Sequence, residues 1–168
     1  LHARGVDTSA VRISRSRSTG MVIATVREDG QRTMIASRGA NAELTLDEAQ
    51  HNLLHSARVV HICDPLPQVL KALPGMVDAR QTDVSLDPGS ISASMGLDDI
   101  AAVLKICRYV FVDQNELHLL TRLTDLAESA QKILAYGPEV LFLKCGAEGC
   151  RIFTNSKQLS APGFAVQS

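Results

Sequence analysis

The 168-residue sequence lacks the features on which nucleic-acid and membrane proteins usually depend. Aromatic residues make up only 4% and tryptophan is absent, so stacking platforms for bases or sugars are scarce. Seventeen basic side chains face eighteen acidic ones, which leaves a net charge of −1 and no general attraction to nucleic acid or an anionic membrane. No apolar run approaches the roughly 18 residues of a membrane span, and the first residues do not form a signal peptide. We therefore expect a cytoplasmic protein with no nucleic-acid and no membrane partner.

The four cysteines also form no Cys-x-x-Cys pair of the kind that zinc and redox sites use. They are Cys63, Cys107, Cys145 and Cys150, in or beside apolar segments, and we expect reduced, mostly buried thiols. What is present is a chain with 45% apolar residues, long enough for one domain with a real core.

Strand-like and helix-like segments alternate from residue 59 onward. The predicted strands are Val59 to Cys63, Asp83 to Leu86, Tyr109 to Val112 and Val140 to Leu143, and the predicted helices lie around 66–73, 97–104, 116–120 and 125–136. Alternation at this spacing predicts parallel strands joined by right-handed crossovers. The expected fold class is therefore α/β, a doubly wound, mostly parallel sheet covered by helices on both faces.

A hairpin precedes this alternation. Met21 to Val26 and Arg32 to Ser37 are strand-like, and Asp29-Gly30 between them is a strong turn signal. Antiparallel neighbours do not fit inside a parallel layer, so we expect a projecting flap. Thr45-x-x-Glu48 then predicts a capping box for a following helix. For the arginine-rich residues 1–19 we favour a basic, solvated strand edge over a binding site.

Polar groups fall where each predicted parallel strand ends, and such ends lie side by side along one edge of a doubly wound sheet. The groups are Asp64, Asp87-Pro88-Gly89, Asp113 to Glu116, and Lys144 with its glycines. Each also has an ordinary explanation, because Asp87-Pro88-Gly89 is a common turn and both Asp64 and Asn115 are suitable helix caps. Their convergence at one edge favours a ligand site.

The segment Val140 to Phe153 carries the clearest part of that site. A buried strand would deliver Lys144 at its carboxyl end, and Gly146 and Gly149 permit a tight reversal whose backbone N–H groups can face an anion. We interpret the segment as one wall of a phosphate site. A plain hairpin between two strands, with no ligand, explains the same residues.

In order along the chain, these motifs resemble those of the ribokinase-like, or phosphofructokinase-B, carbohydrate kinases, and the resemblance covers nearly the whole chain. The matching segments are Gly5 to Ser9, Ser18-Thr19-Gly20, Glu28-Asp29-Gly30, Arg38-Gly39-Ala40-Asn41-Ala42, Asp87-Pro88, Asn115-Glu116 and Lys144 to Gly149. The resemblance implies a phosphotransferase with an alcohol acceptor, with ATP as donor and Mg²⁺ as charge bridge. It also implies a partial β lid, residues 1–41, a nucleotide-binding α/β core, residues 42–168, and a homodimer formed through the lid.

The resemblance assigns site residues as well. They are Arg38, Gly39 and Asn41 in the substrate-side loop, Asn115 as the asparagine of the family's Asn-x-x-Glu motif near metal and phosphates, and Lys144, Gly146 and Gly149 in the nucleotide-side turn. In this alignment His118 replaces the motif's glutamate, and an imidazole is a poor substitute for a carboxylate that holds hydrated Mg²⁺. No metal ligand is therefore assigned.

Two of the family's motifs do not occur in this sequence. The chain stops at Ser168, where the family continues into Gly-Ala-Gly-Asp with its anion-hole glycines and catalytic aspartate. Leu1 starts downstream of the family's amino-terminal substrate motif. We therefore assign no general base, expect the catalytic aspartate beyond Ser168, and expect the chain as given to be incomplete and inactive alone.

The leading hypothesis is that the complete parent protein phosphorylates a hydroxyl of a sugar or sugar-like alcohol with ATP. Arg38 favours a substrate with a carboxylate or phosphate, although an arginine at a strand end needs no ligand. The alternative is a non-catalytic nucleotide- or sugar-binding regulatory module of the same fold, supported by His118 and the missing aspartate. A generic flavodoxin-like domain explains neither the hairpin nor the ordered motifs.

Overall fold

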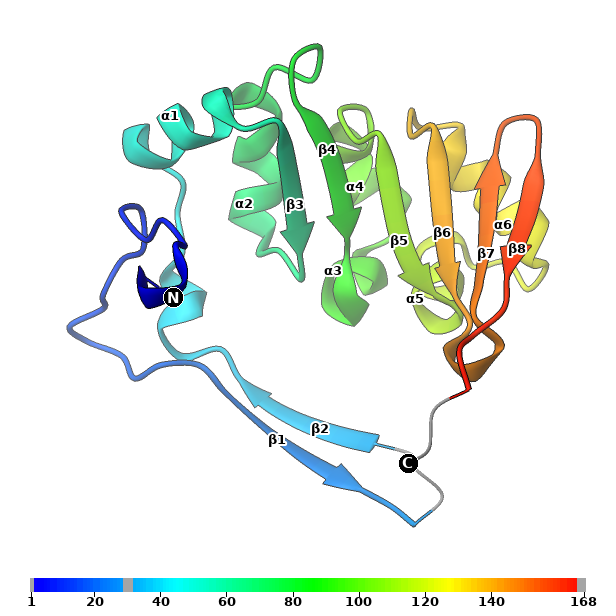
Figure 1. Ribbon diagram of the computed structural model, residues 1–168, viewed down its shortest axis with the longest axis horizontal. Helices are drawn as coiled ribbons and strands as arrows, with labels where there is room; N and C mark the ends of the chain where they lie inside the picture. The colour runs from blue at the N-terminus through cyan, green and yellow to red at the C-terminus, as the bar shows by residue number, and fades with distance from the viewer. Residues whose placement is uncertain (1, 29–31, 166–168) are drawn as a thin grey trace. The chain divides into compact units, whose positions relative to one another are not determined.

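The computed structural model describes residues 2–28 and 32–165, and the chain forms two compact units, residues 1–50 and 51–168 (Figure 1). Helix α1 (Glu48–Ser56) carries the chain from the first unit into the second. Within the described ranges, no helix is long and apolar enough to cross a membrane.

The first unit contains the predicted hairpin. Strands β1 (Met21–Val26) and β2 (Arg32–Ser37) pair antiparallel, with Met21 opposite Ser37, and they form a two-stranded sheet of their own. The prediction of an antiparallel pair outside the parallel layer is therefore confirmed. Its Asp29-Gly30 turn lies outside the described residues.

The arginine-rich segment before the hairpin does not form the expected strand edge. Among residues 2–19 the regular element is a single-turn 3-10 helix, η1 (His2–Arg4), and the rest follows an irregular path. Arg12 forms an ion pair with Asp47, and Arg17 Nε lies 2.9 Å from Glu43 Oε1. The prediction of a strand edge is wrong, because these two arginines connect the segment to residues that follow the hairpin.

The start of α1 differs from the predicted capping box. The reciprocal bonds join Asp47 and Gln50: the Gln50 amide donates to Asp47 Oδ1 at 3.4 Å, and the Asp47 amide donates to Gln50 Oε1 at 3.0 Å. Thr45 lies two residues too early, because α1 begins at Glu48 and a capping side chain stands directly before the first helical residue. The helix was predicted, but its cap was assigned to the wrong residue.

The second unit is built on a six-stranded sheet in the order β3-β4-β5-β6-β7-β8. Its strands are β3 (Val59–Cys63), β4 (Asp83–Asp87), β5 (Tyr109–Asp113), β6 (Val140–Lys144), β7 (Cys150–Thr154) and β8 (Gln158–Ala161). Strands β3 to β6 are parallel, and β7 and β8 continue the sheet antiparallel. The mostly parallel sheet is confirmed. Strand β8 was missed because Leu159 is its single large apolar residue.

Helices connect the parallel strands, as predicted. They are α2 (Pro67–Ala72) with the 3-10 turn η3 (Leu73–Gly75), α3 (Gly89–Met95), α4 (Leu97–Leu104), α5 (Gln114–Thr121) and α6 (Leu126–Leu134). Helix α3 was not predicted, because its glycine and three serines are weak helix formers. The remaining 3-10 helices are η2 (Gly39–Glu43) and η4 (Gly146–Glu148).

The core lies between the sheet and its helices. Alternate side chains of the parallel strands are fully buried, among them Leu86, Val112 and Leu143, and α2 to α6 lie on that same side of the sheet (Figure 1). The opposite face shows no helical cover in the described part of the second unit, where Val59 is 60% exposed. Helices on both faces were expected. Right-handed crossovers that add strands in one direction put every helix on the same face, so a second layer requires a reversal of strand order that these strands do not contain.

Candidate functional site

Three charged side chains meet where β4, β5 and β6 end. Lys144, the last residue of β6, is paired with Asp113 of β5 in the sheet register. Its Nζ donates a hydrogen bond of 2.6 Å to Asp87 Oδ2 at the end of β4 and lies 3.7 Å from Glu116 Oε2 on α5. The expected convergence of strand ends at one edge is therefore confirmed for these residues.

Burial and charge set the protonation of this cluster. The Glu116 side chain is only 7% exposed, and burial raises its pKa, although the hydrogen bond from the Asp113 amide and the charge of Lys144 act in the opposite direction. Burial is the largest single influence on the pKa of Lys144 and lowers it. The hydrogen bond and charge of Asp87, with the charge of Glu116, outweigh burial, so the net effect raises the pKa of Lys144. Lys144 is therefore protonated, and positively charged, at neutral pH.

Asp64 extends the same edge from the end of β3. Its amide donates to Asp87 O at 3.0 Å, and its backbone is left-handed, with a φ of 45° that non-glycine residues rarely adopt. Gly89 makes room for it, since a Cβ there would lie 2.8 Å from Asp64 Oδ1. Asp64 is not the N-cap residue of α2, as had been considered, because Leu66 stands at that position. Strained backbone of this kind is concentrated at functional positions.

The cap of α5 is Asp113, two residues before the predicted Asn115. Asp113 Oδ1 accepts from the Glu116 amide at 2.7 Å, and Glu116 Oε2 accepts from the Asp113 amide at 2.8 Å, which completes a capping box. The interpretation of Asn115 as a helix cap is therefore wrong. Asn115 is exposed in the first turn of α5 and makes no side-chain hydrogen bond within the described residues.

His118 belongs to a different part of α5. Its Nδ1 lies 3.0 Å from Leu123 O, and the ring lines a small cavity of about 220 Å³ with Leu117, Leu126 and Ser129 among its neighbours. Glu116 is the side chain of this helix that approaches Lys144. Asp113-x-x-Glu116 also has the spacing of the family motif, with a carboxylate at its last position.

The glycine turn after Lys144 has the predicted strand–turn–strand form. Gly146 and Gly149 have φ values of 57° and 95°, and β6 and β7 pair antiparallel around η4. The amides of Cys145, Glu148 and Gly149 donate to carbonyls within the turn. In the described part of the chain, Gly146 and Ala147 are the turn residues whose amides make no backbone bond, so they are the two donors that an anion can use.

Gly149 has a packing function in addition. A Cβ at this position would collide with Ala161 O and would lie 2.5 Å from the Gly163 amide nitrogen, whereas a Cβ at Gly146 would meet open space. The two glycines are therefore required for different reasons. Gly149 lets the chain after β8 pass against the turn, and Gly146 supplies only the backbone conformation.

The four cysteines are free thiols, as predicted. Cys107 alone is buried, and burial raises its pKa to about 12. Cys63 is exposed, although burial of its thiol, followed by the charges of Asp87 and Asp64, raises its pKa as well. The expectation of mostly buried thiols therefore holds for one of the four cysteines.

Within the described residues, no group of three or more histidine, cysteine, aspartate or glutamate side chains is arranged to hold a metal ion. Mg²⁺ does not require such a group, because it usually keeps several waters and binds through one or two carboxylates together with substrate phosphates. Glu116 and Asp87 are the carboxylates that face Lys144. Two carboxylates alone would leave most of the six oxygen positions of a Mg²⁺ ion to water or to another ligand.

The predicted substrate-side residues lie in the first unit, at the base of the hairpin. Arg38 is the N-cap residue of η2, and Gly39 has a φ of 50°. A Cβ at Gly39 would collide with Ser18 O and lie 2.8 Å from the Gly20 nitrogen, while a Cβ at Gly20 would lie 2.8 Å from Arg38 O. The two legs of the hairpin therefore touch through glycines, and no side chain fits between them.

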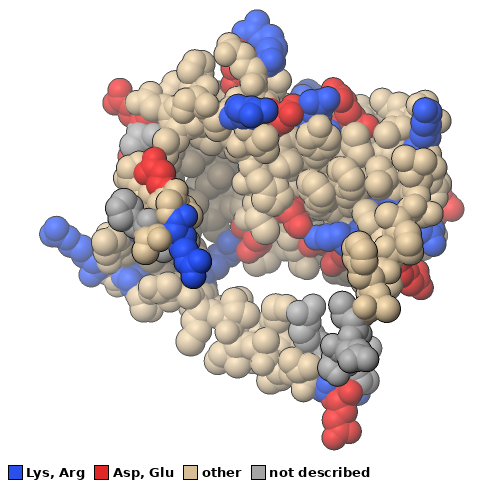
Figure 2. Space-filling view, in the orientation of Figure 1, with Lys and Arg blue, Asp and Glu red and all other residues tan. Residues whose placement is uncertain are grey.

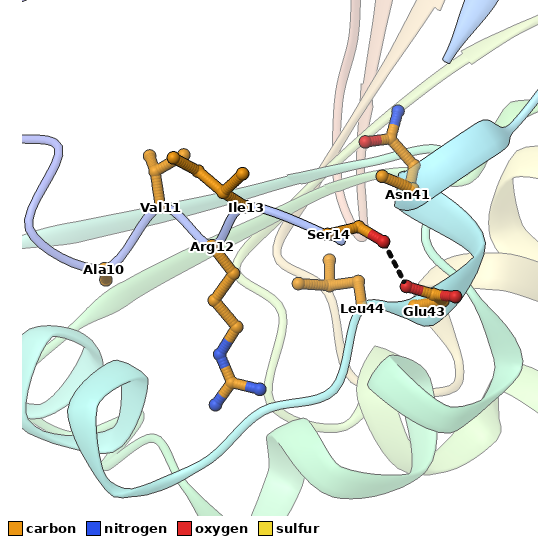
Figure 3. A pocket seen from close by; sticks show the side chains of 9 residues that line it. Ala10, Val11, Arg12, Ile13, Ser14, Asn41, Glu43 and Leu44 are labelled. Atoms are coloured by element: carbon orange, nitrogen blue, oxygen red, sulfur yellow. Dashed lines mark hydrogen bonds between the residues drawn. The ribbon is translucent and has the colours of Figure 1, made fainter. Parts of the chain in front are cut away.

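A groove of about 420 Å³ opens beside this contact, between residues 10–14 and 40–44 (Figure 3). Ser14 points toward Glu43 and donates to it at 2.8 Å, and Ser16 and Arg17 donate to the same carboxylate at 3.0 and 2.9 Å. The hydrogen bonds from Ser14 and Ser16 lower the pKa of Glu43. Asn41 also lines the groove, so one of the three predicted substrate residues borders a cavity that can hold a small polar molecule.

The second unit is thus an α/β sheet with one lysine among carboxylates and a glycine turn at its edge, and the first unit contains a separate antiparallel hairpin. The model of the pfkB family of carbohydrate kinases matches residues 1–168, the whole chain. The chain therefore belongs to this family, and the resemblance found in its motifs is confirmed.

Individual relatives agree with this assignment. The chain is 27% identical over 160 residues to an uncharacterized sugar kinase of Archaeoglobus fulgidus and 25% identical over 168 residues to the ATP-dependent ribose-1-phosphate kinase of Halopiger xanaduensis. These matches cover 93% and 100% of this chain but only 63% and 54% of the relatives. A putative ribokinase II from E. coli, solved with ATP and Mg²⁺, shares the fold with a TM-score of 0.71 and 20% identity, over 90% of this chain and 52% of its own.

Proposed function

We propose that the complete protein containing this chain is an ATP-dependent carbohydrate kinase that transfers a phosphoryl group to a hydroxyl of a sugar or sugar-like alcohol. The observation that carries the proposal is the pairing of Lys144 with Asp87 and Glu116 at the carboxyl edge of the sheet, next to a turn with two available amides. The H. xanaduensis relative is named as an ATP-dependent kinase, which agrees with this assignment.

Lys144, Gly146 and Gly149 form the phosphate side of the proposed site. The ammonium group attracts the phosphates of ATP, and the amides of Gly146 and Ala147 donate hydrogen bonds to their oxygens. A charged, positioned donor lowers the barrier because phosphoryl transfer depends on placement and on stabilisation of the charge on the transferred group.

Glu116 is the proposed carboxylate for Mg²⁺, together with Asp87. The ion supplies charge neutralisation between the phosphates when it is bound. We propose that the Asn-x-x-Glu motif corresponds to Asp113-x-x-Glu116, and that Asn115 serves as an exposed donor to phosphate or bound water. With Glu116 at the last position of the motif, the chain has the carboxylate that is missing when His118 is placed there. This favours a kinase over a non-catalytic binding module. The general base is proposed to lie outside residues 1–168, as an aspartate after Ser168.

Arg38, Gly39 and Asn41 are proposed to face the sugar, beside the groove of the first unit. Asn41 offers an amide donor and acceptor to sugar hydroxyls, and the Arg38 guanidinium can grip a carboxylate or phosphate. The name of the ribose-1-phosphate kinase shows that a relative accepts a phosphorylated sugar. A sugar phosphate is therefore a substrate worth testing alongside neutral sugars.

The hairpin is proposed to act as the lid and to form a homodimer. Its strands expose apolar side chains, including Met21 at 60%, Ile23 at 52% and Ile35 at 68%, and Figure 2 shows most of its surface as uncharged. An apolar ribbon of this kind marks an interaction surface. Light scattering of the complete protein should show a dimer that Ile23→Lys converts to a monomer, whereas a wild-type monomer would contradict this assignment.

A coupled assay of ADP release tests the kinase itself. The purified complete protein, which we expect in the cytoplasm, is supplied with ATP and Mg²⁺ and with ribose, fructose or ribose 1-phosphate in turn. We expect turnover with at least one acceptor, no turnover without Mg²⁺, and a loss of about 10²-fold in kcat for Glu116→Gln. Binding of ATP without turnover on any acceptor would instead support the regulatory module.

A further inference from the structure

Two histidines on α1 form a pair that the kinase proposal does not use. His51 and His55 lie four residues apart, so they stand on the same face of the helix in consecutive turns. Their rings stack with centroids 6.1 Å apart and planes inclined by 12°. Both residues are exposed, so the two imidazoles can rotate without displacing packed neighbours.

This spacing suits a single transition-metal ion. Imidazole nitrogens bind Zn²⁺ at about 2.0–2.1 Å, and two rings on one tetrahedral ion therefore have centroids about 5 Å apart. The ring centroids of His51 and His55, 6.1 Å apart, need to approach by only about 1 Å to reach that separation, and rotation of the two exposed rings is needed to aim one nitrogen of each at the ion. The helical motif of zinc proteases presents two histidine ligands at the same separation of four residues.

We propose that His51 and His55 form a two-histidine site for a borderline transition-metal ion such as Zn²⁺, with water completing the coordination. The site differs in chemistry from the proposed Mg²⁺ position, because Mg²⁺ prefers oxygen ligands and imidazole suits zinc, copper and nickel. Two protein ligands give a moderate affinity, so the ion exchanges with solution. The site is occupied only when such a metal is available.

Metal binding has a structural consequence for α1. The helix has nine residues, which is too short to be stable in isolation, and it carries the chain between the two units. A bridge between His51 and His55 fixes two consecutive turns to each other. Zinc binding should therefore stabilise the helix through which the chain passes from the first unit to the second.

Calorimetric titration of the complete protein with ZnCl₂, without nucleotide, tests the site. We expect one zinc ion to bind per chain at this position, and His51→Ala and His55→Ala each to weaken that binding by about tenfold or more. Asn52→Ala, an exposed neighbour on the same helix, should leave the affinity unchanged. Zinc binding that persists undiminished in His51→Ala would overturn the proposal.

A register control separates a built pair from two independent imidazoles. The double change His55→Ser with Ser56→His keeps both imidazoles but places them five residues apart, about 140° around the helix. This variant should bind zinc as weakly as the alanine variants, and equal binding to wild type would contradict the shared site. Far-UV circular dichroism should be unchanged in every variant, because all of these positions are exposed. The kinase assay is independent of this outcome.

Discussion

Lys144 and Asp87 form an ion pair across a strand, since they end β6 and β4 and the strand between them, β5, ends at Asp113. The 2.6 Å bond therefore holds the lysine over the first turn of α5, where Glu116 lies 3.7 Å from the same nitrogen. Under the proposed function, the phosphates of ATP compete with these two carboxylates for Lys144. The predictions below separate these roles.

Lys144→Ala in the complete protein should raise the KM for ATP by about tenfold, because one charged contact to phosphate is lost. The lysine side chain is 44% exposed, so loss of its ion pairs should lower the free energy of unfolding by no more than about 1 kcal/mol. Lys105→Ala, a change at an exposed lysine after α4, is the matched control. A destabilised protein with an unaltered KM would show that Lys144 only joins strand ends.

The capping box predicts that Asp113 contributes to stability and that Asn115 contributes to turnover. Asp113→Ala should cost about 1 kcal/mol of stability, because the Glu116 amide loses its acceptor. Asn115→Ala should leave the melting temperature nearly unchanged and lower kcat by about 10² if the side chain contacts phosphate or metal-bound water. Thermal melts and initial rates on both variants measure the two effects. Equal stability losses would contradict the assignment of the cap.

The two glycines of the turn should respond differently to alanine. Gly146→Ala meets open space and should cost about 1 kcal/mol, the strain of a positive φ alone. Gly149→Ala adds a collision with the backbone at Ala161, so its cost should be larger by several kcal/mol or the protein should fail to fold. Denaturant unfolding of the two variants compares these costs. Similar losses would mean that the chain after β8 does not pack against the turn.

Ionisation of Glu116 should reduce stability as the pH rises. Its pKa in the folded protein is raised above the ordinary value of 4.5, so the folded state holds this proton more tightly than the unfolded state does. The resulting stabilisation is present at low pH and is lost as the pH rises through the folded pKa. Glu116→Gln, which keeps a side-chain oxygen for the capping box, should therefore stabilise the protein more at about pH 7.5 than at about pH 4. Melting curves at the two values test the sign of this difference.

Periodicity in the sequence was sufficient for most of the fold. The bounds of β1, β2, β3 and α4 agree with the predicted segments, because each is a continuous apolar or amphipathic run that a charged residue follows. Helix α3 escaped prediction because contacts in the folded protein, such as the buried Ser92 hydroxyl donating to Pro65 O at 2.9 Å, compensate for its weak helix formers. Such contacts join residues far apart in sequence and leave no local pattern.

The site was harder to predict for a related reason. Lys144 and the glycine turn follow from the strand that precedes them, but the cap of α5 depends on where the helix begins. Here β5 ends at Asp113 and α5 starts at Gln114, with no loop residue between them. A short loop would have made Asn115 the cap. The residue at which α5 begins also decides whether Glu116 or His118 lies beside Lys144. The sequence motifs alone did not fix that residue.

The contact between Gly20 and Gly39 has a mechanical consequence for the hairpin. The backbone at Gly39 lies directly against Ser18 and Gly20, so the segments that lead into β1 and out of β2 are in close contact at the base of the hairpin. If the hairpin acts as the proposed lid, its two strands must therefore move together. A side chain at either glycine would force the two legs apart at the base of the hairpin and uncouple the two strands there. Neither glycine can therefore be replaced without displacing backbone atoms of the opposite leg.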